Sequence, residues 1–284
     1  MVTDKTLRPL DGEILTVDKP LGWSSFHVVK KLRGALCARL RKAGIRKLKV
    51  GHAGTLDPLA TGVMIICTGK STKRIDELQS GVKEYIATIK LGATTPSFDL
   101  ETPVDAVYPV EHITRELVED CLRGFTGRIE QVPPSYSACK VDGDRAYKKA
   151  RRGEEVELKP KTLVIDAIEL LEYRKDEITV RVVCSKGTYI RALARDIGAA
   201  LGSGGHLTAL RRTRVGECRI EDALTIEDAV RMICEQEMTV ASESGEELDV
   251  EKGEYDGAHM LKERADIKSY AERTAQTEIP ASEG

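Results

Sequence analysis

Alternating apolar and polar positions near the start of the chain predict a strand followed by a helix. The stretch "GEILTVDKP" has the alternation of a short strand and ends at Pro20. Ser24 then precedes apolar residues at helical spacing, so we expect its side chain to cap a helix. The apolar positions of that helix are Val28, Val29, Leu32, Leu36 and Leu40.

Similar patterns along the chain predict more strands than helices. Further strands are expected at "VMIIC", "EYIATIKLG", "SYSACKV", "LVIDAIELL", "EITVRVVCS" and "LRRTRVGECRI". Helices are expected at "TKRIDELQ" after Ser71, at "ITRELVEDCLRGF", at "YIRALARDIGAALG" and at "IEDAVRMICEQE" after Thr225. Because strands follow strands without an intervening helix, the pattern favours an α+β fold. We predict a mixed, mostly antiparallel sheet flanked by helices rather than a doubly wound parallel sheet.

The hydrophobic pattern fades after Glu235. Residues 235–284 contain 14 acidic and 5 basic residues, whereas residues 1–234 have an excess of seven positive charges. A segment so acidic and so poor in large apolar residues cannot bury enough surface to offset its chain entropy. We therefore expect one domain over residues 1–234. The rest, residues 235–284, should be an acidic tail that is disordered or forms one marginal helix and is dispensable for chemistry.

Composition limits the class of protein. With 41% hydrophobic and 32% charged residues among 284, a soluble globular protein is expected. No apolar run is long enough for a membrane helix, and the N-terminus does not resemble a signal peptide, which predicts a cytoplasmic protein without a membrane partner. The seven cysteines lack paired spacing, so we expect buried thiols and no metal site.

Clusters of positive charge suggest a polyanionic partner. Nine Lys or Arg and no Asp or Glu lie between Lys30 and Lys49, either as a solvated helix face or, as we favour, as phosphate contacts. The stretches "DRAYKKARRG" and "SKGTYIRALARD" combine cations with Tyr147 and Tyr189, and "LRRTRVG" combines cations with small residues. Cations hold phosphates and aromatic rings stack on unpaired bases, although each tyrosine could equally pack in the core or at its rim.

A single carboxylate stands out in "VGHAGTLDPLATGVMIICTGK". Asp57 precedes a proline and lies among leucines, between Gly54 and Gly62. It is either a structural cap of the following turn or a catalytic carboxylate with a cationic partner elsewhere in the chain. The following "CTGKST" is no phosphate-binding loop, because Met64 stands where that motif needs glycine, so an ATPase is disfavoured.

Taken together, the motifs resemble the TruB-type pseudouridine synthases. "GHAGTLDPLATGV" resembles the catalytic motif of that family, and "DKPLGWSSFHVV" its N-terminal Lys-Pro segment. The segments "KEYIATIKLG", "QVPPSYSACKVDGDRAYKKARRG", "CSKGTYIRALARDIG" and "GGHLTALRRTRVGEC" resemble further family blocks in the same order. These blocks extend from about Gly12 to Ile220, and the resemblance implies the pseudouridine synthase fold with a catalytic domain over residues 1–234.

The resemblance implies an enzyme that isomerises a uridine in the TΨC arm of tRNA, position 55, to pseudouridine without a cofactor. It implies Asp57 as the catalytic aspartate, Arg191 as its ionic partner and Tyr85 as the residue that stacks on the target base. The residues expected to contact the RNA or the flipped uridine are His52, Tyr189 and Leu210, and those expected to support the site are Lys19 and Pro20.

The family includes guide-RNA-dependent and stand-alone members. "DPLATGV" and "KPLGWSSF" resemble the stand-alone bacterial form, so we expect tRNA as the partner, no guide RNA and a monomer. Many bacterial members carry a PUA domain after the last block, and here the acidic tail takes that place. A non-catalytic RNA-binding protein or tRNA chaperone on the same scaffold is the alternative, which the presence of both Asp57 and Arg191 disfavours.

Overall fold

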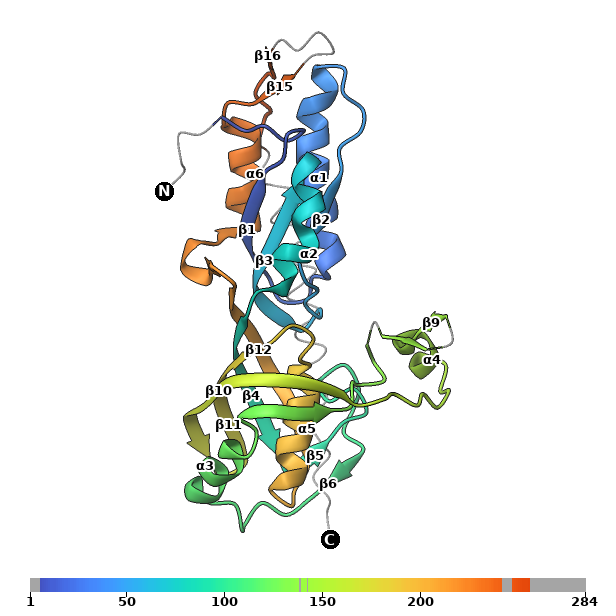
Figure 1. Ribbon diagram of the computed structural model, residues 1–284, viewed down its shortest axis with the longest axis vertical. Coiled ribbons are helices and arrows are strands. Elements are labelled where there is room, and N and C mark those ends of the chain that lie inside the picture. Colours follow the sequence, from blue (N-terminus) through green and yellow to red (C-terminus); the bar gives the residue numbers. More distant parts are fainter. Residues whose placement is uncertain (1–5, 138, 142, 242–246, 256–284) are drawn as a thin grey trace. The chain divides into compact units, whose positions relative to one another are not determined.

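The computed structural model describes residues 6–137, 139–141, 143–241 and 247–255 (Figure 1). The chain forms two compact units. Of the described residues, the first unit contains those up to Gly81 and those from Arg212 onward, and the second contains Val82–Arg211. The chain returns from the second unit to the first within strand β12 (Gly205–Val215).

The first unit contains strands and helices from both ends of the chain. Strand β1 (Ile14–Lys19) pairs antiparallel with β3 (Ala60–Thr68), with Val17 opposite Met64. Further strands of this unit are β2 (Val50–His52), β13 (Cys218–Arg219) and β14 (Leu224–Thr225), of which β14 pairs parallel with β1. The helices are α1 (Ser25–Lys42), η1 (Gly69–Arg74), α2 (Ile75–Ser80), η2 (Ile220–Asp222) and α6 (Ile226–Glu235).

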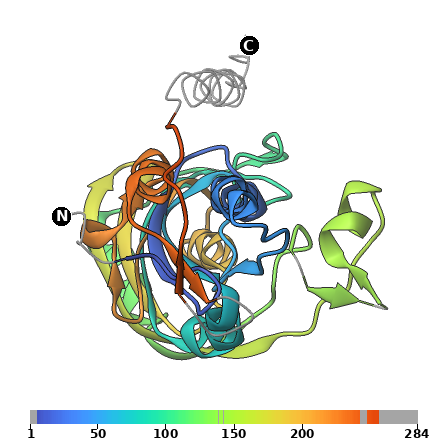
Figure 2. The same ribbon diagram turned by 90° about the horizontal axis from the view of Figure 1, so that it is seen from above.

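Both faces of strand β3 are buried. Met64 and Ile66 belong to a core that they share with α1 and α6, whereas Val63, Ile65 and Cys67 belong to a second core that α2 borders. Because side chains alternate across a strand, a continuous apolar run such as "VMIIC" can serve both cores. Figure 2 shows α1 and α6 together on one side of β1, and α2 on the other side.

Two of the three predicted helix caps are confirmed. The side chain of Ser24 accepts a hydrogen bond from the amide of His27, and that of Thr225 from the amide of Asp228. The prediction for Ser71 was wrong, because the chain forms the 3₁₀ helix η1 there and α2 begins only at Ile75 without a side-chain cap.

The second unit has an antiparallel sheet. Its strands are ordered β4 (Lys83–Leu91), β11 (Glu177–Cys184), β10 (Lys161–Arg174) and β7 (Gly127–Gln131). The helices α3 (Arg115–Arg123) and α5 (Ile190–Ala200) belong to this unit. Short hairpins pair β5 (Ala93–Thr94) with β6 (Ala106–Val107), and β8 (Lys140–Val141) with β9 (Asp144–Arg145).

The alternation in β4 follows the prediction. Every second residue from Lys83 to Leu91 is buried, and the residues between them are half-buried. On that half-buried face the Arg181 guanidinium lies 2.6 Å from Glu84 and 3.0 Å from Glu169. The predicted α+β class with a mainly antiparallel sheet is confirmed. The strand expected at "SYSACKV" is shorter than predicted, because only Lys140 and Val141 of it pair.

The chain after Glu235 differs from the expected tail. Strands β15 (Thr239–Ala241) and β16 (Glu247–Asp249) pair antiparallel. Met238, Val240 and Val250 are buried in the core that contains α1 and α6. A few well-placed apolar residues therefore attach an otherwise acidic segment, and the packing of the first unit extends past the expected boundary at 234. The remainder of that tail, 256–284, lies outside the described residues.

Within the described part of the chain, no helix combines the length and the apolar character that crossing a membrane requires.

Candidate active site

Asp57 lies in the loop that joins β2 to β3 in the first unit. Two glycines let the backbone turn tightly around it. Gly54 has a φ of +102° and Gly62 a φ of +109°, both in the left-handed region that favours glycine. A Cβ at Gly62 would lie 2.1 Å from the backbone oxygen of Arg212. Only glycine at this position of β3 therefore allows β12 to come so close. The loop that contains Asp57 therefore packs closely against the sheet in a defined conformation.

Lys19 is fully buried next to this loop. Its ammonium donates to the carbonyl oxygens of Trp23, Pro20 and Pro58 at 2.6, 2.9 and 3.3 Å. Burial lowers the pKa of Lys19 to about 7, the negative charge of Asp57 acts in the opposite direction, and the positive charge of Arg212 lowers it further. Lys19 thus ties the segment after β1 to the proline that follows Asp57.

His52 and Pro20 also belong to the first unit. His52 is the last residue of β2, where burial lowers the pKa of its imidazole and the nearby charge of Arg212 acts in the same direction. A neutral imidazole is the form that burial favours. Pro20 directly follows β1 and its carbonyl is one of the acceptors of Lys19.

Arg191 is held in the second unit at the start of α5. Its two terminal nitrogens donate to the carbonyls of Ser97 at 3.0 Å and Tyr136 at 2.9 Å, and its Nε lies 3.5 Å from a carboxylate oxygen of Asp99. Both side chains of the ion pair are buried. Phe98, which lies between Ser97 and Asp99 in the sequence, has a φ of +62°, and this is unusual for a residue with a side chain. The loop after β5, which contacts the guanidinium through Ser97 and Asp99, therefore has a strained backbone at Phe98.

Tyr189 precedes α5 and contacts two side chains that the sequence did not single out. Its amide donates to the buried side chain of Gln131 at 2.8 Å, which anchors the N-terminus of the helix. Its hydroxyl lies 3.3 Å from the sulfur of Cys139. Burial opposes ionisation of this thiol, but hydrogen bonds with Tyr189 and Ser137 and the nearby Lys161 together outweigh it, so the pKa of Cys139 is lowered.

Tyr85 and Leu210 lie on strands of the second unit. Tyr85 is a buried residue of β4 and lies on the opposite face of the strand from Glu84. Leu210 lies near the end of the part of β12 that belongs to this unit, and it is half-buried. The predicted site residues thus fall into two groups. The first unit holds Lys19, Pro20, His52 and Asp57, and the second holds Tyr85, Tyr189, Arg191 and Leu210.

Of the nine cations between Lys30 and Lys49, one is not available to RNA. Arg39 is buried and donates to the carbonyls of Ile233, Gln236, Val250 and Glu251 at 2.7 to 2.9 Å. Its role is to attach the C-terminal segment to α1. Most of the others are exposed, namely Lys30, Arg33, Arg41, Lys42, Arg46, Lys47 and Lys49.

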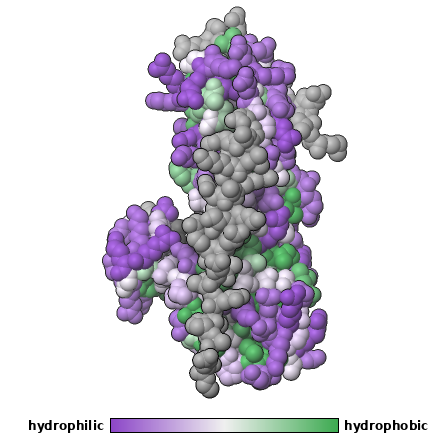
Figure 3. Space-filling model, turned by 180° about the vertical axis from the view of Figure 1, so that it is seen from behind, coloured by the Kyte–Doolittle hydropathy of each residue, from purple (hydrophilic) through white to green (hydrophobic). Residues whose placement is uncertain are grey.

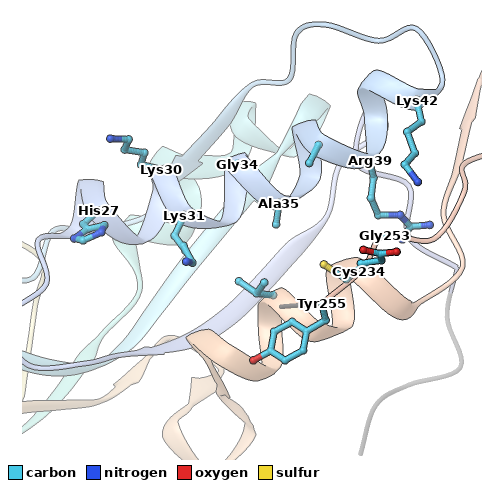
Figure 4. A pocket seen from close by; sticks show the side chains of 13 residues that line it. His27, Lys30, Lys31, Gly34, Ala35, Arg39, Lys42, Cys234, Gly253 and Tyr255 are labelled. Atoms are coloured by element: carbon cyan, nitrogen blue, oxygen red, sulfur yellow. The ribbon is translucent and has the colours of Figure 1, made fainter. Parts of the chain in front are cut away.

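A groove of about 1020 Å³ runs beside α1 in the same unit. Its small and apolar lining includes Gly34, Ala35 and Val230, and Lys30, Lys31 and Lys42 also line it. Figure 4 shows Lys31 and Arg39 directed from α1 toward α6 and the segment at Gly253, while Lys30 points away from them. None of the predicted site residues lines this groove.

The other basic stretches differ from one another. Helix α4 (Ala146–Arg151) carries "KKAR" and, with β9, stands apart from the sheet of its unit (Figure 1). This projecting segment is mostly hydrophilic in the surface view of Figure 3. In "LRRTRVG", however, Arg212 is buried and donates to carbonyls of the Asp57 loop, so this cation of the stretch is not available to phosphates.

Four residues with a direct role in the geometry were missed from the sequence. Ser25, Asp99, Gln131 and Arg212 each contact a predicted site residue or its loop through a buried polar side chain. Ser25 looked like part of a helix start and Arg212 like part of a basic patch. Asp99 lies in a loop, and Gln131 and Arg212 lie in strands with other polar or charged residues, so no local pattern of the sequence distinguished them.

Comparison with protein families places most of the chain in one family. Residues 41–190 match the model of the N-terminal domain of the TruB family pseudouridylate synthases, and residues 191–249 match the model of the tRNA pseudouridylate synthase B C-terminal domain. The second match reaches beyond residue 234, in agreement with the packing of the C-terminal segment.

Relatives and solved structures agree with this assignment. The tRNA pseudouridine synthase B of Phocaeicola vulgatus is 68% identical over 228 residues, which cover 80% of this chain and 96% of that protein. That of Bacteroides fragilis is 63% identical over 231 residues, covering 81% and 98%.

Two solved structures are similar at lower identity. A crystal structure of a Cbf5-Nop10-Gar1 complex has a TM-score of 0.58 and 29% identity, covering 79% of this chain and 55% of that chain. A structure of an H/ACA RNP bound to a substrate RNA containing 2′-deoxyuridine has a TM-score of 0.56 and 27% identity, covering 78% and 53%. This chain thus spans about half the length of those two chains. Together with the family models, these matches show that the chain belongs to the TruB family of pseudouridylate synthases.

Proposed function

We propose that the protein isomerises uridine 55 in the TΨC arm of tRNA to pseudouridine, with Asp57 as the catalytic carboxylate. Family membership supports a tRNA pseudouridine synthase, an isomerase. The observation that carries the role of Asp57 is its place in a loop whose backbone is tied down on both sides by buried polar side chains. Such a loop holds one carboxylate in one place, which is what a reaction at a single base requires.

The chemistry needs no reactant other than the RNA. The bond between N1 of the base and C1′ of the ribose breaks, and a bond forms between C5 and C1′. The proton on C5 is lost and N1 gains one, so nothing is oxidised, reduced or hydrolysed. One carboxylate can start this sequence by attacking the base or sugar, or by taking a proton from the sugar. Asp57 is the residue that we assign to that step.

The second unit would supply the groups that hold the base. Arg191 is proposed as the ionic partner of Asp57, because a guanidinium that carbonyls already orient can keep a carboxylate ionised and fixed. Tyr85 is proposed to stack on the target base. Tyr189, Leu210 and His52 are proposed to contact the RNA or the flipped uridine, which must leave its stack at a cost of a few kcal/mol. Lys19 and Pro20 support the loop.

The affinity for tRNA is proposed to come from exposed cations on both units. On the first unit these are the exposed members of the run from Lys30 to Lys49. On the second unit they are the cations of α4, which projects from its sheet (Figure 1). Phosphate contacts of this kind supply affinity and position without reading sequence. We propose that no guide RNA is required and that the protein acts as a monomer.

The test is incubation of the purified protein with an unmodified tRNA transcript, without cofactor, followed by chemical mapping of pseudouridine. A transcript with cytidine at position 55 is the matched control. We expect one modified position, uridine 55, in the first transcript and none in the second. A tRNA-binding protein that modifies neither would support the non-catalytic alternative, and modification at another position would refute the assignment of the substrate site.

A further inference from the structure

We propose that Arg212 and Ser25 are positioning residues for Asp57, which fix the catalytic loop without touching the substrate. The inference rests on the proposed function, because it assigns a mechanistic role to residues that hold the loop of the proposed catalytic carboxylate. Neither residue belongs to the groups proposed above to contact RNA. Their side chains are 2% and 3% exposed, so their hydrogen bonds are shielded from competition by water.

Every backbone carbonyl from Gly54 to Pro58 accepts a hydrogen bond. The guanidinium of Arg212 donates to Gly54 at 3.2 Å and to Thr55 at 3.4 Å. The hydroxyl of Ser25 donates to Leu56 at 2.9 Å, and the amide of Ala60 donates to Asp57 at 3.1 Å. The carbonyl of Pro58 accepts from Lys19 and from the amide of Gly22. Because these hydrogen bonds fix one carbonyl after another, they restrain the path of the backbone on both sides of Asp57.

Ser25 contacts the residue before Asp57 twice. Its oxygen donates to the carbonyl of Leu56 and accepts from the amide of Leu56 at 2.8 Å. Both polar groups of that residue are thus bound to one side chain, which fixes the peptide planes on each side of Leu56. Ser25 is the first residue of α1, and α1 is anchored in the core by Val28, Leu32 and Leu36. The helix therefore sets the position of the loop.

Arg212 connects the loop to the sheet. Its Nε donates to the carbonyl of Val63 in β3 at 2.8 Å, while its two terminal nitrogens reach Gly54 and Thr55. All three acceptors are neutral carbonyls, and the planar fork of arginine is the group that can hold several of them in fixed directions. Lysine would keep the charge but present a single nitrogen on a flexible chain, so it could not reproduce this geometry.

The expected consequence is loss of rate rather than loss of binding. A displacement of about 1 Å of a catalytic group can cost a factor of about 10² in rate. Since Arg212 and Ser25 are buried, unlike the cations proposed to contact phosphates, tRNA affinity should depend little on them. A purely structural role would instead lower the melting temperature and leave the rate of the folded enzyme unchanged.

The chain offers matched controls for both residues. Arg39 is a second buried arginine in the same unit, and it also donates only to backbone carbonyls, but in the C-terminal segment. Ser24 is the neighbour of Ser25 and caps α1 without contacting the loop. Comparing Arg212→Lys with Arg39→Lys, and Ser25→Ala with Ser24→Ala, separates a role in catalysis from a role in folding.

The experiment measures single-turnover pseudouridine formation at saturating tRNA, the Kd for tRNA and the melting temperature of each variant. We expect Arg212→Lys and Ser25→Ala to slow the single-turnover step by about 30- to 100-fold at temperatures where they are folded. Their Kd values should stay within about threefold of wild type. Arg39→Lys and Ser24→Ala should melt earlier than wild type but react within about threefold of its rate.

Single-turnover rates of Arg212→Lys and Ser25→Ala equal to those of their controls would overturn the inference. If Arg212→Lys does not fold, Ser25→Ala and Ser24→Ala decide alone, because removing a hydroxyl leaves the core packing intact. The wild-type protein is measured in the same assay. If it forms no pseudouridine at position 55, the proposed function is refuted instead.

Discussion

Arg191 and Asp99 form a buried ion pair, with the Nε of the arginine 3.5 Å from a carboxylate oxygen of the aspartate. The sequence predicted Asp57 as the ionic partner of Arg191 and did not indicate Asp99. The two assignments are compatible, because a guanidinium has five N–H groups and can serve more than one acceptor. A permanent carboxylate partner in the second unit would keep Arg191 oriented before any substrate binds.

We predict that Arg191→Lys is not a mild change. Lysine retains the charge but loses the planar fork that the carbonyls of Ser97 and Tyr136 hold. The single-turnover rate should fall by a factor of about 10². Arg181→Lys is the control, because Arg181 forms its ion pairs on the half-buried face of the sheet. Equal rates for the two variants would show that the orientation of the guanidinium at position 191 is unimportant.

Asp57→Asn should abolish isomerisation and spare the fold. The amide has nearly the same shape as the carboxylate, and Lys19, Ser25 and Arg212 hold the loop through its backbone carbonyls, which the substitution leaves in place. We expect an unchanged melting temperature within a few degrees, an unchanged Kd for tRNA and no detectable pseudouridine. Turnover within tenfold of wild type would remove Asp57 from the mechanism.

Stability should rise with pH between about 7 and 10.5 because of Lys19. Burial lowers the pKa of Lys19 from 10.5 in the unfolded chain to about 7 in the folded protein. In that window the unfolded chain holds a proton that the folded protein has lost, so the free energy of unfolding increases with pH by up to about 1.4 kcal/mol per pH unit.

Below pH 7 both states hold the proton and the cost of burying the charge is complete. Lys19→Met should therefore show a weaker rise in the free energy of unfolding between pH 7 and 9.5 than wild type, as measured by urea titration. Lys175→Met, at an exposed lysine in the second unit, is the control and should leave the slope unchanged. Identical slopes in wild type and Lys19→Met would argue that Lys19 stays charged throughout this range.

The position of a C-terminal truncation should decide its effect. A chain that ends after Tyr255 keeps β15, β16 and the acceptors of Arg39, so its stability and single-turnover rate should match those of the full chain. A chain that ends after Met238, just past the domain boundary expected from the sequence, loses the buried side chains of Val240 and Val250 and two acceptors of Arg39.

We expect the shorter chain to lose about 3 kcal/mol or more of its free energy of unfolding. Urea titrations of the two truncated chains and the full chain measure this difference. If both truncated chains are as stable as the full protein, the segment from Thr239 to Tyr255 contributes nothing to folding.

Reversing exposed charges near α1 should weaken the salt dependence of tRNA binding. In a variant with Lys30→Glu, Arg33→Glu and Lys47→Glu, three phosphate contacts would be lost. The slope of log K against log salt should then become less steep by about 2 to 3. The single-turnover rate at saturating tRNA should be nearly unchanged, because these residues position the RNA and do not react.

A variant with the same change of charge elsewhere is the control: Arg115→Glu, Arg123→Glu and Lys175→Glu, around α3 and the turn after β10. Its salt slope should stay close to that of wild type. Equal slopes for the two variants would mean that the run from Lys30 to Lys49 is a solvated helix face.

The sequence by itself determined the local features of this protein. Periodicity and capping residues identified α1, α6 and the strands of a mainly antiparallel sheet, because these signals depend on neighbours in the chain. Motif order identified the family and the residues proposed for chemistry. The same local reasoning failed for the segment after Glu235, whose composition is acidic, because three buried side chains there find a core made by distant residues.

Only the tertiary structure decided what the isolated polar residues do. Arg39 and Arg212 both lie in basic stretches, yet both are buried and donate to backbone carbonyls, whereas Lys30 and Lys47 in the same run as Arg39 remain exposed. Ser24 and Ser25 are adjacent, yet one caps its own helix and the other holds the residue before Asp57. The acceptors of Arg39, Arg212 and Ser25 are carbonyl groups far away in sequence, and a backbone carbonyl leaves no trace in residue identity because every residue has one.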